Sequence, residues 1–161
     1  MQNQRMGSSR ILAEIKQSKP FASLDQEVGV AFMKTADHLR RLHSPIFEAR
    51  GITEQQYNVL RILRGAGSEG LPTLSVGERL IEQTPGITRL VDRLEAKQLV
   101  RRERPATDRR QVSCLITKAG LELLEQLDPE VLECSERSFR YVTKAELQAL
   151  LKILEKIRDA E

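Results

Sequence analysis

The stretch that decides the fold runs from residue 84 to residue 117 and is T-P-G-I-T-R-L-V-D-R-L-E-A-K-Q-L-V-R-R-E-R-P-A-T-D-R-R-Q-V-S-C-L-I-T. It opens with a helix-start signal, because Thr84 suits the N-cap and Pro85 suits the first helical position. Four apolar residues then follow at i, i+3, i+4 and i+7, which gives a helix one buried face: Ile87, Leu90, Val91 and Leu94. The other face is polar and partly basic.

The periodicity changes after this helix. Residues 100–104 and 111–115 favour two short strands, and residues 105–110 favour the loop between them. A helix with a polar and basic outward face, followed directly by an arginine-rich hairpin, is the arrangement of a winged helix.

Positive charge is concentrated in the same stretch. Between residues 84 and 118 there are nine Lys or Arg and four Asp or Glu, a net charge of +5, whereas the whole chain carries only +3. A concentrated basic patch is typical of a nucleic-acid binder. A basic hairpin considered alone could equally be a solvated surface with no binding role. The polar and basic helix in front of it favours nucleic-acid binding over that alternative.

Three capping boxes mark further helices, which we expect over residues 24–47, 54–64 and from 144 onwards: Ser23 with Gln26, Thr53 with Gln56, and Thr143 with Glu146. Residues 65–72 are expected to form a flexible loop. Thr73 is expected to cap a short helix to about residue 81, the first helix of a helix-turn-helix. Thr117 is expected to cap a helix that bends or restarts at residues 128–129.

Length and composition bound the class of protein. The 161 residues, 40% of them hydrophobic, suit one compact domain with helical extensions. The predicted fold is mainly α with a small β-hairpin wing. The sequence shows no apolar run long enough for a membrane helix and no secretory h-region, so we expect a cytoplasmic protein. Two cysteines, Cys114 and Cys134, do not make a disulfide framework.

The whole pattern resembles the MarR family of bacterial transcription regulators, over roughly residues 21–160. The family's recognition helix, strand step, wing motif and following turn match residues 88–95, 99–100, 108–110 and 116–120, and its second helix matches residues 52–53 and 56–60. Gln98 departs from the pattern, since the family usually has glycine there, where the backbone often turns left-handed. The resemblance implies an extension over 1–20 and a single domain over 21–161, with the winged helix over about 52–117.

The resemblance also implies how DNA is bound. The N-terminal part of the recognition helix should enter the major groove, with four residues at base edges and nearby phosphates: Thr84, Gly86, Thr88 and Arg89. Arg93 is expected at a phosphate or paired with a carboxylate of the wing.

The wing motif carries three more expected roles. Arg110 should insert into the minor groove at the tip of the wing, and Arg109 should contact phosphate. Asp108 should hold an arginine in position, because phosphates repel a carboxylate.

The helices outside the winged helix, about 23–50 and 118–161, carry much apolar surface. They form either an ordinary core within one subunit or, as the resemblance implies, a homodimerisation region. A two-fold dimer presents two recognition helices, and so should bind an inverted repeat in double-stranded DNA with half-sites about 34 Å apart.

The resemblance implies an anionic aromatic small molecule as an effector, and four polar residues are candidates for its crevice: His38, Arg41, His43 and Tyr57. Taken singly, each of them is better explained as a surface residue or as a satisfied core residue. The two histidines are five apart, not the i, i+4 of helical zinc pairs, so we expect no metal and no cofactor. The peroxide-sensing branch uses an N-terminal cysteine, which this sequence lacks.

Two functions of different class follow. The first is a sequence-specific DNA-binding regulator, expected to be a repressor, which the basic face from Arg89 to Arg110 supports. The second is a winged helix that docks an acidic protein partner through its basic face. An enzyme is a distant third, because the sequence contains no catalytic cluster and no glycine-rich phosphate loop.

Overall fold

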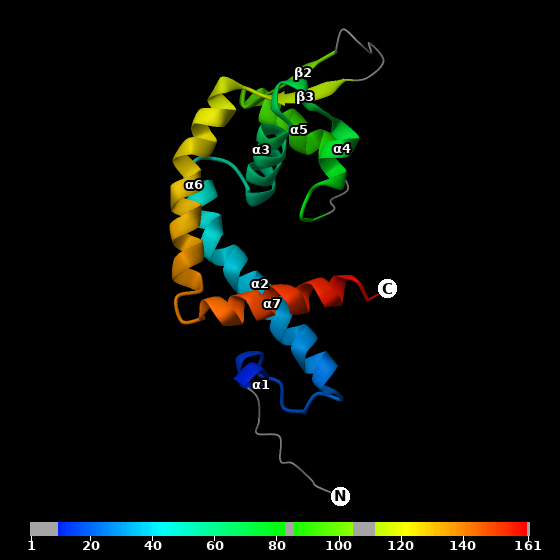
Figure 1. The fold of residues 1–161 in the computed structure, drawn as a ribbon, viewed down its shortest axis with the longest axis vertical. Coiled ribbons are helices and arrows are strands. Elements are labelled where there is room, and N and C mark those ends of the chain that lie inside the picture. The colour runs from blue at the N-terminus through cyan, green and yellow to red at the C-terminus, as the bar shows by residue number, and fades with distance from the viewer. Residues whose placement is uncertain (1–9, 83–85, 105–111, 161) are drawn as a thin grey trace, which may run out of the picture. The chain divides into compact units, whose positions relative to one another are not determined.

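The computed structural model describes residues 10–82, 86–104 and 112–160 (Figure 1). The chain divides into two compact units, Met1–Leu42 and His43–Glu161. The boundary lies inside a helix that belongs to the predicted dimerisation region. Four residues predicted to contact DNA lie outside the described residues: Thr84, Asp108, Arg109 and Arg110.

The first unit contains helix α1 (Arg10–Glu14) and most of helix α2 (Leu24–Glu48). One of the two hydrogen bonds of the predicted capping box forms at the start of α2, since the backbone N–H of Gln26 donates to the Ser23 hydroxyl at 3.2 Å. The Gln26 side chain, however, accepts from the backbone N–H of Ala22, one residue before the expected partner.

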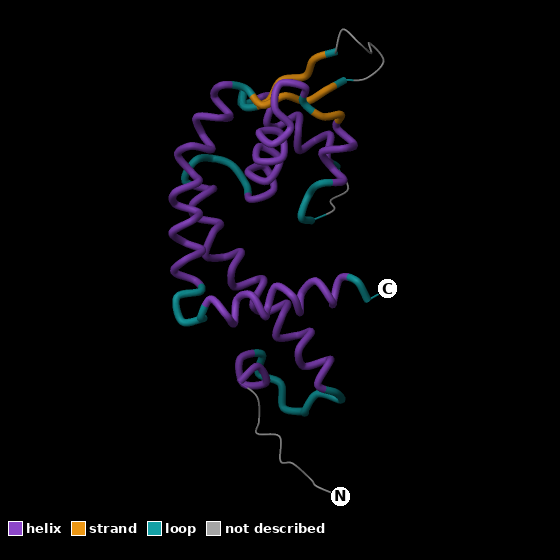
Figure 2. The backbone as a smooth tube through the Cα atoms, viewed as in Figure 1, coloured by secondary structure: helices purple, strands orange, loops and turns teal. Residues whose placement is uncertain are grey.

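The second unit carries a winged helix-turn-helix (Figures 1 and 2). Helices α3 (Glu54–Ala66), α4 (Thr73–Glu78) and α5 (Ile87–Ala96) pack with strands β1 (Leu71–Pro72), β2 (Val100–Glu103) and β3 (Ser113–Ile116). The antiparallel sheet has the order β1-β3-β2. Fully buried aliphatic side chains from the helices and the sheet form one core, among them Val59, Leu63, Val76, Val91, Leu94, Val100 and Leu124. The predicted fold class is confirmed.

The segment 65–72 is not the flexible loop that the sequence favoured. Helix α3 extends to Ala66, a 3-10 turn (η1) covers Gly67–Glu69, and β1 pairs with β3. The pairing requires a close approach, because a Cβ on Gly70 would collide with the carbonyl oxygen of Cys114. A two-residue strand is too short to show a hydrophobic pattern.

Two predicted helix starts need correction. Thr73 is the first residue of α4 and not its cap, and its hydroxyl lies 3.3 Å from the Cys114 sulfur. The described part of α5 begins at Ile87. The N-cap residue of this helix is Gly86, which has a φ of 112° and no side chain to accept a capping hydrogen bond. A residue in this left-handed conformation cannot be helical, so α5 cannot run unbroken from Pro85.

Helix α6 (Lys118–Ser138) leaves the sheet through the predicted cap, with the Thr117 hydroxyl accepting from the Gly120 backbone N–H at 3.1 Å. Gly120 is required there, because a Cβ would collide with the Leu99 carbonyl oxygen. The helix continues through Pro129 without a restart. Helix α7 (Lys144–Arg158) begins with the predicted capping box of Thr143 and Glu146.

None of the helices in the part of the chain that the structure describes has the length and apolarity needed to cross a membrane.

Gln98, the residue that replaces the family's usual glycine, lies in the turn between α5 and β2. Gln98 has a φ of 59°, the left-handed conformation that the sequence comparison with the family predicted. Its N–H donates to the Glu95 carbonyl and that of Leu99 donates to the Leu94 carbonyl, the two hydrogen bonds of a Schellman motif.

We therefore expect Gln98→Gly to raise the free energy of unfolding by about 0.5–1 kcal/mol. Glycine relieves the steric cost of a Cβ in this conformation, and its greater freedom in the unfolded chain offsets part of the gain. Urea unfolding checks the value. Gln98→Ala retains the Cβ and should bring no gain, so equal stabilisation by both variants would contradict the explanation.

Candidate nucleic-acid interface

The first turn of α5 presents the predicted recognition residues to solvent. The apolar stripe turns inward, with Val91 and Leu94 at 0% exposure. Gly86, Thr88 and Arg89 are exposed on the opposite side. The amphipathic spacing thus selects which side chains are available to a groove of DNA.

Arg102, on β2, ties the base of the wing to α5. Its guanidinium contacts the Glu95 carboxylate at 2.6 Å and the Asp92 carboxylate at 2.6 Å, and it donates to the Thr88 carbonyl at 3.4 Å. Its backbone N–H also donates to Glu95 at 3.1 Å. Burial by itself lowers the pKa of Arg102, but the bond to Asp92 and the nearby carboxylates raise it overall, so the guanidinium stays charged.

Sequence reasoning counted Arg102 only as part of the basic charge and did not predict this link. The signal was the pair of acids on α5, Asp92 and Glu95, which lie three apart on one helix face. Helix spacing makes them neighbours, but only the folded hairpin shows which arginine reaches them.

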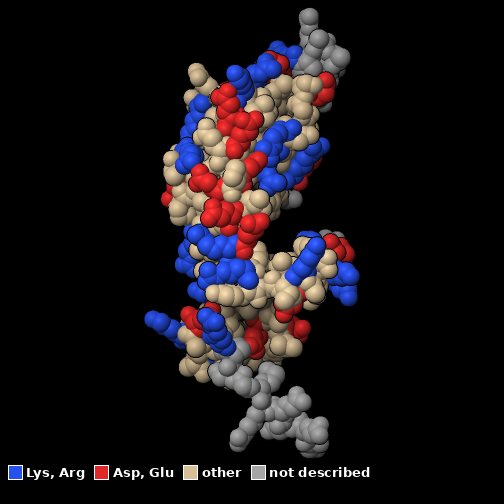
Figure 3. All heavy atoms as spheres, turned by 60° about the vertical axis from the view of Figure 1, so that its left-hand side comes forward, with Lys and Arg blue, Asp and Glu red and all other residues tan. Residues whose placement is uncertain are grey.

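The ion pairs redistribute the charge of the interface. Arg101 pairs with Glu103 on the same strand, as Arg102 does with the acids of α5. Within the described residues, Arg89 and Arg93 of α5 have no carboxylate partner. Figure 3, which brings the left-hand side of Figure 1 forward, shows acidic and basic side chains side by side in the upper part of that face. Unpaired arginines, and not total charge, mark the positions able to meet phosphate or bases.

The candidate effector residues fall in both units. His38 and Arg41 are in the first, where Arg41 pairs with Asp37 at 2.6 Å. His43 and Tyr57 are in the second, and each contacts α6. The His43 imidazole lies 3.2 Å from the Ser135 hydroxyl. Their shared crevice stays a prediction.

Tyr57 belongs to a polar network that joins α3 to α6. Its hydroxyl donates to Asp128 at 3.0 Å, and Arg64 contacts the other carboxylate oxygen at 2.6 Å. Burial and the Asp128 carboxylate raise the pKa of Tyr57 to about 12, so the hydroxyl remains a donor. Burial would raise the pKa of Asp128, but the hydrogen bonds from Arg64 and Tyr57 outweigh it and hold that pKa below its ordinary value.

Metal-ligating side chains and cysteines are the other groups of chemical interest among the described residues. Among the described residues, no three His, Cys, Asp or Glu side chains gather as a metal site would require. Cys114 and Cys134 are both buried thiols, and they are not joined in a disulfide.

Comparisons with known proteins agree with the architecture. The family model described as transcriptional regulator SarA/Rot matches residues 41–127. The HTH-type transcriptional regulator TtmR of Methylorubrum extorquens is 34% identical over 137 residues, which cover 85% of this chain and 68% of the relative. The crystal structure of a MarR transcription factor from Planctomyces limnophilus is 38% identical, with a TM-score of 0.65, and the match covers 84% of this chain and 98% of that one. BpsR of Bordetella bronchiseptica, at 24% identity and a TM-score of 0.75, shares the fold, with 89% and 100% covered.

The fold and the exposed first turn of α5 define a winged helix-turn-helix DNA-binding protein. The chain belongs to the MarR family of transcriptional regulators, a family and fold of regulators and not of enzymes.

We expect Arg102→Gln to lower the free energy of unfolding by roughly 1–3 kcal/mol, because it removes hydrogen bonds to two carboxylates and leaves those carboxylates without their counter-charge. Urea unfolding measures the loss. The control is Arg101→Gln, whose partner is on an exposed part of the strand and whose loss should cost under about 1 kcal/mol. Equal losses in the two variants would contradict a special role for Arg102.

The Asp128 network predicts an acid-sensitive contribution to stability. Because the folded-state pKa of Asp128 lies below that of the unfolded chain, about 3.9, its stabilisation is complete well above that value and is lost as the pH falls through the folded pKa. We expect Asp128→Asn to be less stable at pH 7 and to lose less stability between pH 6 and pH 3, measured by urea unfolding. Asp159→Asn, at the exposed end of α7, should keep the parent's pH dependence.

Proposed function

We propose that this regulator is a repressor that binds an inverted-repeat operator as a homodimer, with α5 in the major groove and the wing in the minor groove. The observation that carries the proposal is the exposed first turn of α5, which presents Thr88 and Arg89 on a helix anchored by buried Val91 and Leu94. Relatives named as repressors include NicR of Pseudomonas putida, at 29% identity.

Each predicted contact has a distinct role in this proposal. Arg89 makes a bidentate contact with guanine or with the nearest phosphate, and Gly86 with Thr88 allows the helix to approach the base edges. Thr84 contacts the backbone beside them. At the wing, Arg110 enters the minor groove, Arg109 contacts phosphate and Asp108 positions an arginine. Arg93 has no described carboxylate partner, which supports its role at phosphate.

The fold supports a DNA-bound arrangement of this kind. Sco3205 of Streptomyces coelicolor and MepR of S. aureus, which share the fold at 20% and 21% identity, have been solved in complex with DNA. A regulator that acts on chromosomal DNA works in the cytoplasm, which is the compartment we propose.

The homodimer is proposed from exposed apolar surface. Helix α7 contains no buried residue, and its apolar side chains Leu151, Ile153 and Ile157 are each more than half exposed. In the first unit, Phe32 and Met33 on α2 are 53% and 63% exposed. Apolar side chains in such number favour burial against a second copy. Two copies related by a two-fold axis then require an inverted repeat.

A small anionic aromatic effector is proposed as the regulatory signal. Two proteins that share the fold at 24% identity have been studied with such compounds, namely BpsR with 6-hydroxynicotinic acid and NadR with 4-hydroxyphenylacetate. His38, Arg41, His43 and Tyr57 remain the sequence-based candidates for polar contacts to it.

The test is selection of binding sites from random duplex DNA at two salt concentrations. We expect an enriched inverted repeat with half-sites about one helical turn apart, bound as a dimer and weakened by salt as counterions are released. Salt-sensitive binding without an enriched sequence would overturn sequence specificity. Absence of binding at low salt would favour the docking of an acidic protein partner instead.

A wing variant decides whether the hairpin contacts DNA. Replacing Asp108, Arg109 and Arg110 by Ala should weaken operator binding at least about 100-fold, since minor-groove and phosphate contacts are lost from both protomers. Lys152→Ala is the control, because it removes the same net charge from α7. Equal affinity of the wing variant and the parent protein in a gel-shift titration would refute the proposed wing contacts.

A further inference from the structure

The chain that leaves α4 is held by the side chains of α3, the helix that precedes the helix-turn-helix pair. The backbone N–H of Ile81, shortly after the end of α4, donates to the side-chain oxygen of Asn58 at 3.2 Å. At the next residue, the Glu82 carboxylate accepts from the side-chain amide of Gln55 at 3.3 Å. Gln55 and Asn58 are three apart, so they are neighbours on one face of α3. Two consecutive residues after α4 are thus tied to a single face of α3.

The contact from Asn58 is the one that fixes the backbone. The N–H groups of Arg79 and Leu80 still donate to carbonyls within α4, whereas that of Ile81 donates to Asn58. Leu80 is buried at 8% exposure, but the side chain of Ile81 is 84% exposed. Burial therefore does not hold Ile81 in place. The hydrogen bond to Asn58 does, at the point where the chain stops following α4.

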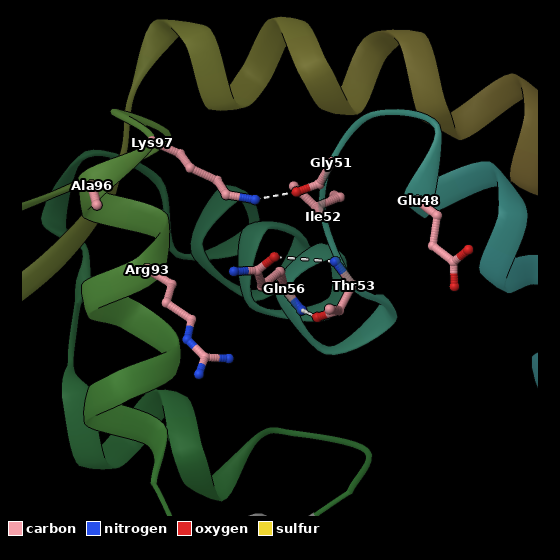
Figure 4. Close-up of a pocket in the computed structure, with 8 residues that line it drawn as sticks. All are labelled: Glu48, Gly51, Ile52, Thr53, Gln56, Arg93, Ala96 and Lys97. Atoms are coloured by element: carbon pink, nitrogen blue, oxygen red, sulfur yellow. Dashed lines mark hydrogen bonds between the residues drawn. The ribbon is translucent and has the colours of Figure 1, made fainter.

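Helix α3 is itself fixed, so it can serve as the reference for this part of the chain. Its start is closed by both hydrogen bonds of the capping box formed by Thr53 and Gln56 (Figure 4). The two neighbours of Asn58 in the sequence, Tyr57 and Val59, lie in the core at 6% and 0% exposure. The backbone of Asn58 cannot shift without disturbing that core, and its side-chain oxygen is a well-placed acceptor.

Other contacts anchor α5 further along the chain. The side chain of Ile87, at the start of α5, packs on Gly77 of α4, where an added Cβ would lie 3.6 Å from it. At the opposite end of α5, the Lys97 ammonium donates to the Gly51 carbonyl (Figure 4). Neither contact involves the residues directly after α4. Asn58 supplies the constraint there, and α5 begins only a few residues later.

We propose that Asn58 is a positioning residue for DNA recognition. Its hydrogen bond to Ile81 sets the path of the chain out of α4, and thereby the place of the first turn of α5, which carries Thr88 and Arg89. Asn58 acts through this turn and not by touching DNA. The effect on DNA binding rests on the proposed function, whereas the anchoring of Ile81 does not.

The expected consequence is a loss of sequence specificity. Hydrogen bonds to base edges require side chains at exact positions, whereas contacts with phosphate tolerate small displacements and carry no sequence information. A displaced first turn of α5 therefore weakens binding to the operator more than binding to unrelated duplex DNA. The ratio of these two affinities reports the role of Asn58.

The experiment compares Asn58→Leu, which is similar in size but has no acceptor, with Asn58→Asp, which keeps an acceptor oxygen. Each protein is titrated with the selected operator and with unrelated duplex DNA. We expect the affinity ratio to fall at least about fivefold in Asn58→Leu and to stay within about twofold of the parent in Asn58→Asp. The ratio cancels the repulsion between an added carboxylate and phosphate, because that repulsion acts on both DNAs.

Gln126→Leu is the matched control, because it removes a side-chain amide from an exposed position on α6 and should leave the ratio unchanged. Asn58→Ala repeats the test with a smaller side chain, in case leucine disturbs the packing, and should lower the ratio as Asn58→Leu does. An equal fall in Asn58→Leu and Asn58→Asp would overturn the role of the acceptor.

Amide hydrogen exchange at Ile81, measured by NMR on the full-length protein without DNA, tests the anchor separately from the proposed function. We expect exchange at least about threefold faster in Asn58→Leu, because a net hydrogen-bond contribution is lost, and no faster than the parent in Asn58→Asp. Unchanged exchange in Asn58→Leu refutes the anchor. Faster exchange with an unchanged affinity ratio refutes the positioning role. Absence of operator binding by the parent protein refutes the proposed function, and the exchange result still decides the anchor.

Discussion

Burial of one face of α5 is the constraint on which the rest of the interface depends. Val91 and Leu94 are fully buried in the core that α3, α4, α6 and the sheet complete. Because the helix cannot rotate without exposing these side chains, Thr88 and Arg89 are held at the surface. Core packing and recognition are thus two faces of one ten-residue helix.

The clamp made by Arg102 extends this constraint to the wing. A strand pair alone would leave the hairpin free to move relative to the recognition helix. Contacts to Asp92, Glu95 and the Thr88 carbonyl fix β2 against α5 near the proposed DNA-contacting residues. The arrangement also explains how a helix with two acids can serve a DNA-binding role, since the carboxylates of Asp92 and Glu95 are both paired with Arg102.

The two ends of α5 have different chemical environments. Its first turn is open to solvent, whereas Arg93 and Lys97 in its second half border a pocket that also includes the buried amide of Gln56. One helix therefore has an exposed polar turn at one end and lines a pocket at the other.

The sequence by itself determined the helices with strong local signals and the winged-helix class. The apolar spacing of residues 87–94 and the capping boxes at Thr53 and Thr143 are local features, encoded in a few consecutive residues. The left-handed conformation at Gln98 was predicted from the resemblance to the MarR family, because glutamine itself gives no signal for it. Tertiary structure alone decided the pairing of β1 with β3, the start of α5 after Gly86, the partners of Arg102 and the pocket at Gln56. Each of these depends on contacts between residues far apart in the chain or on backbone geometry, and neither periodicity nor composition records which distant residues the fold brings together.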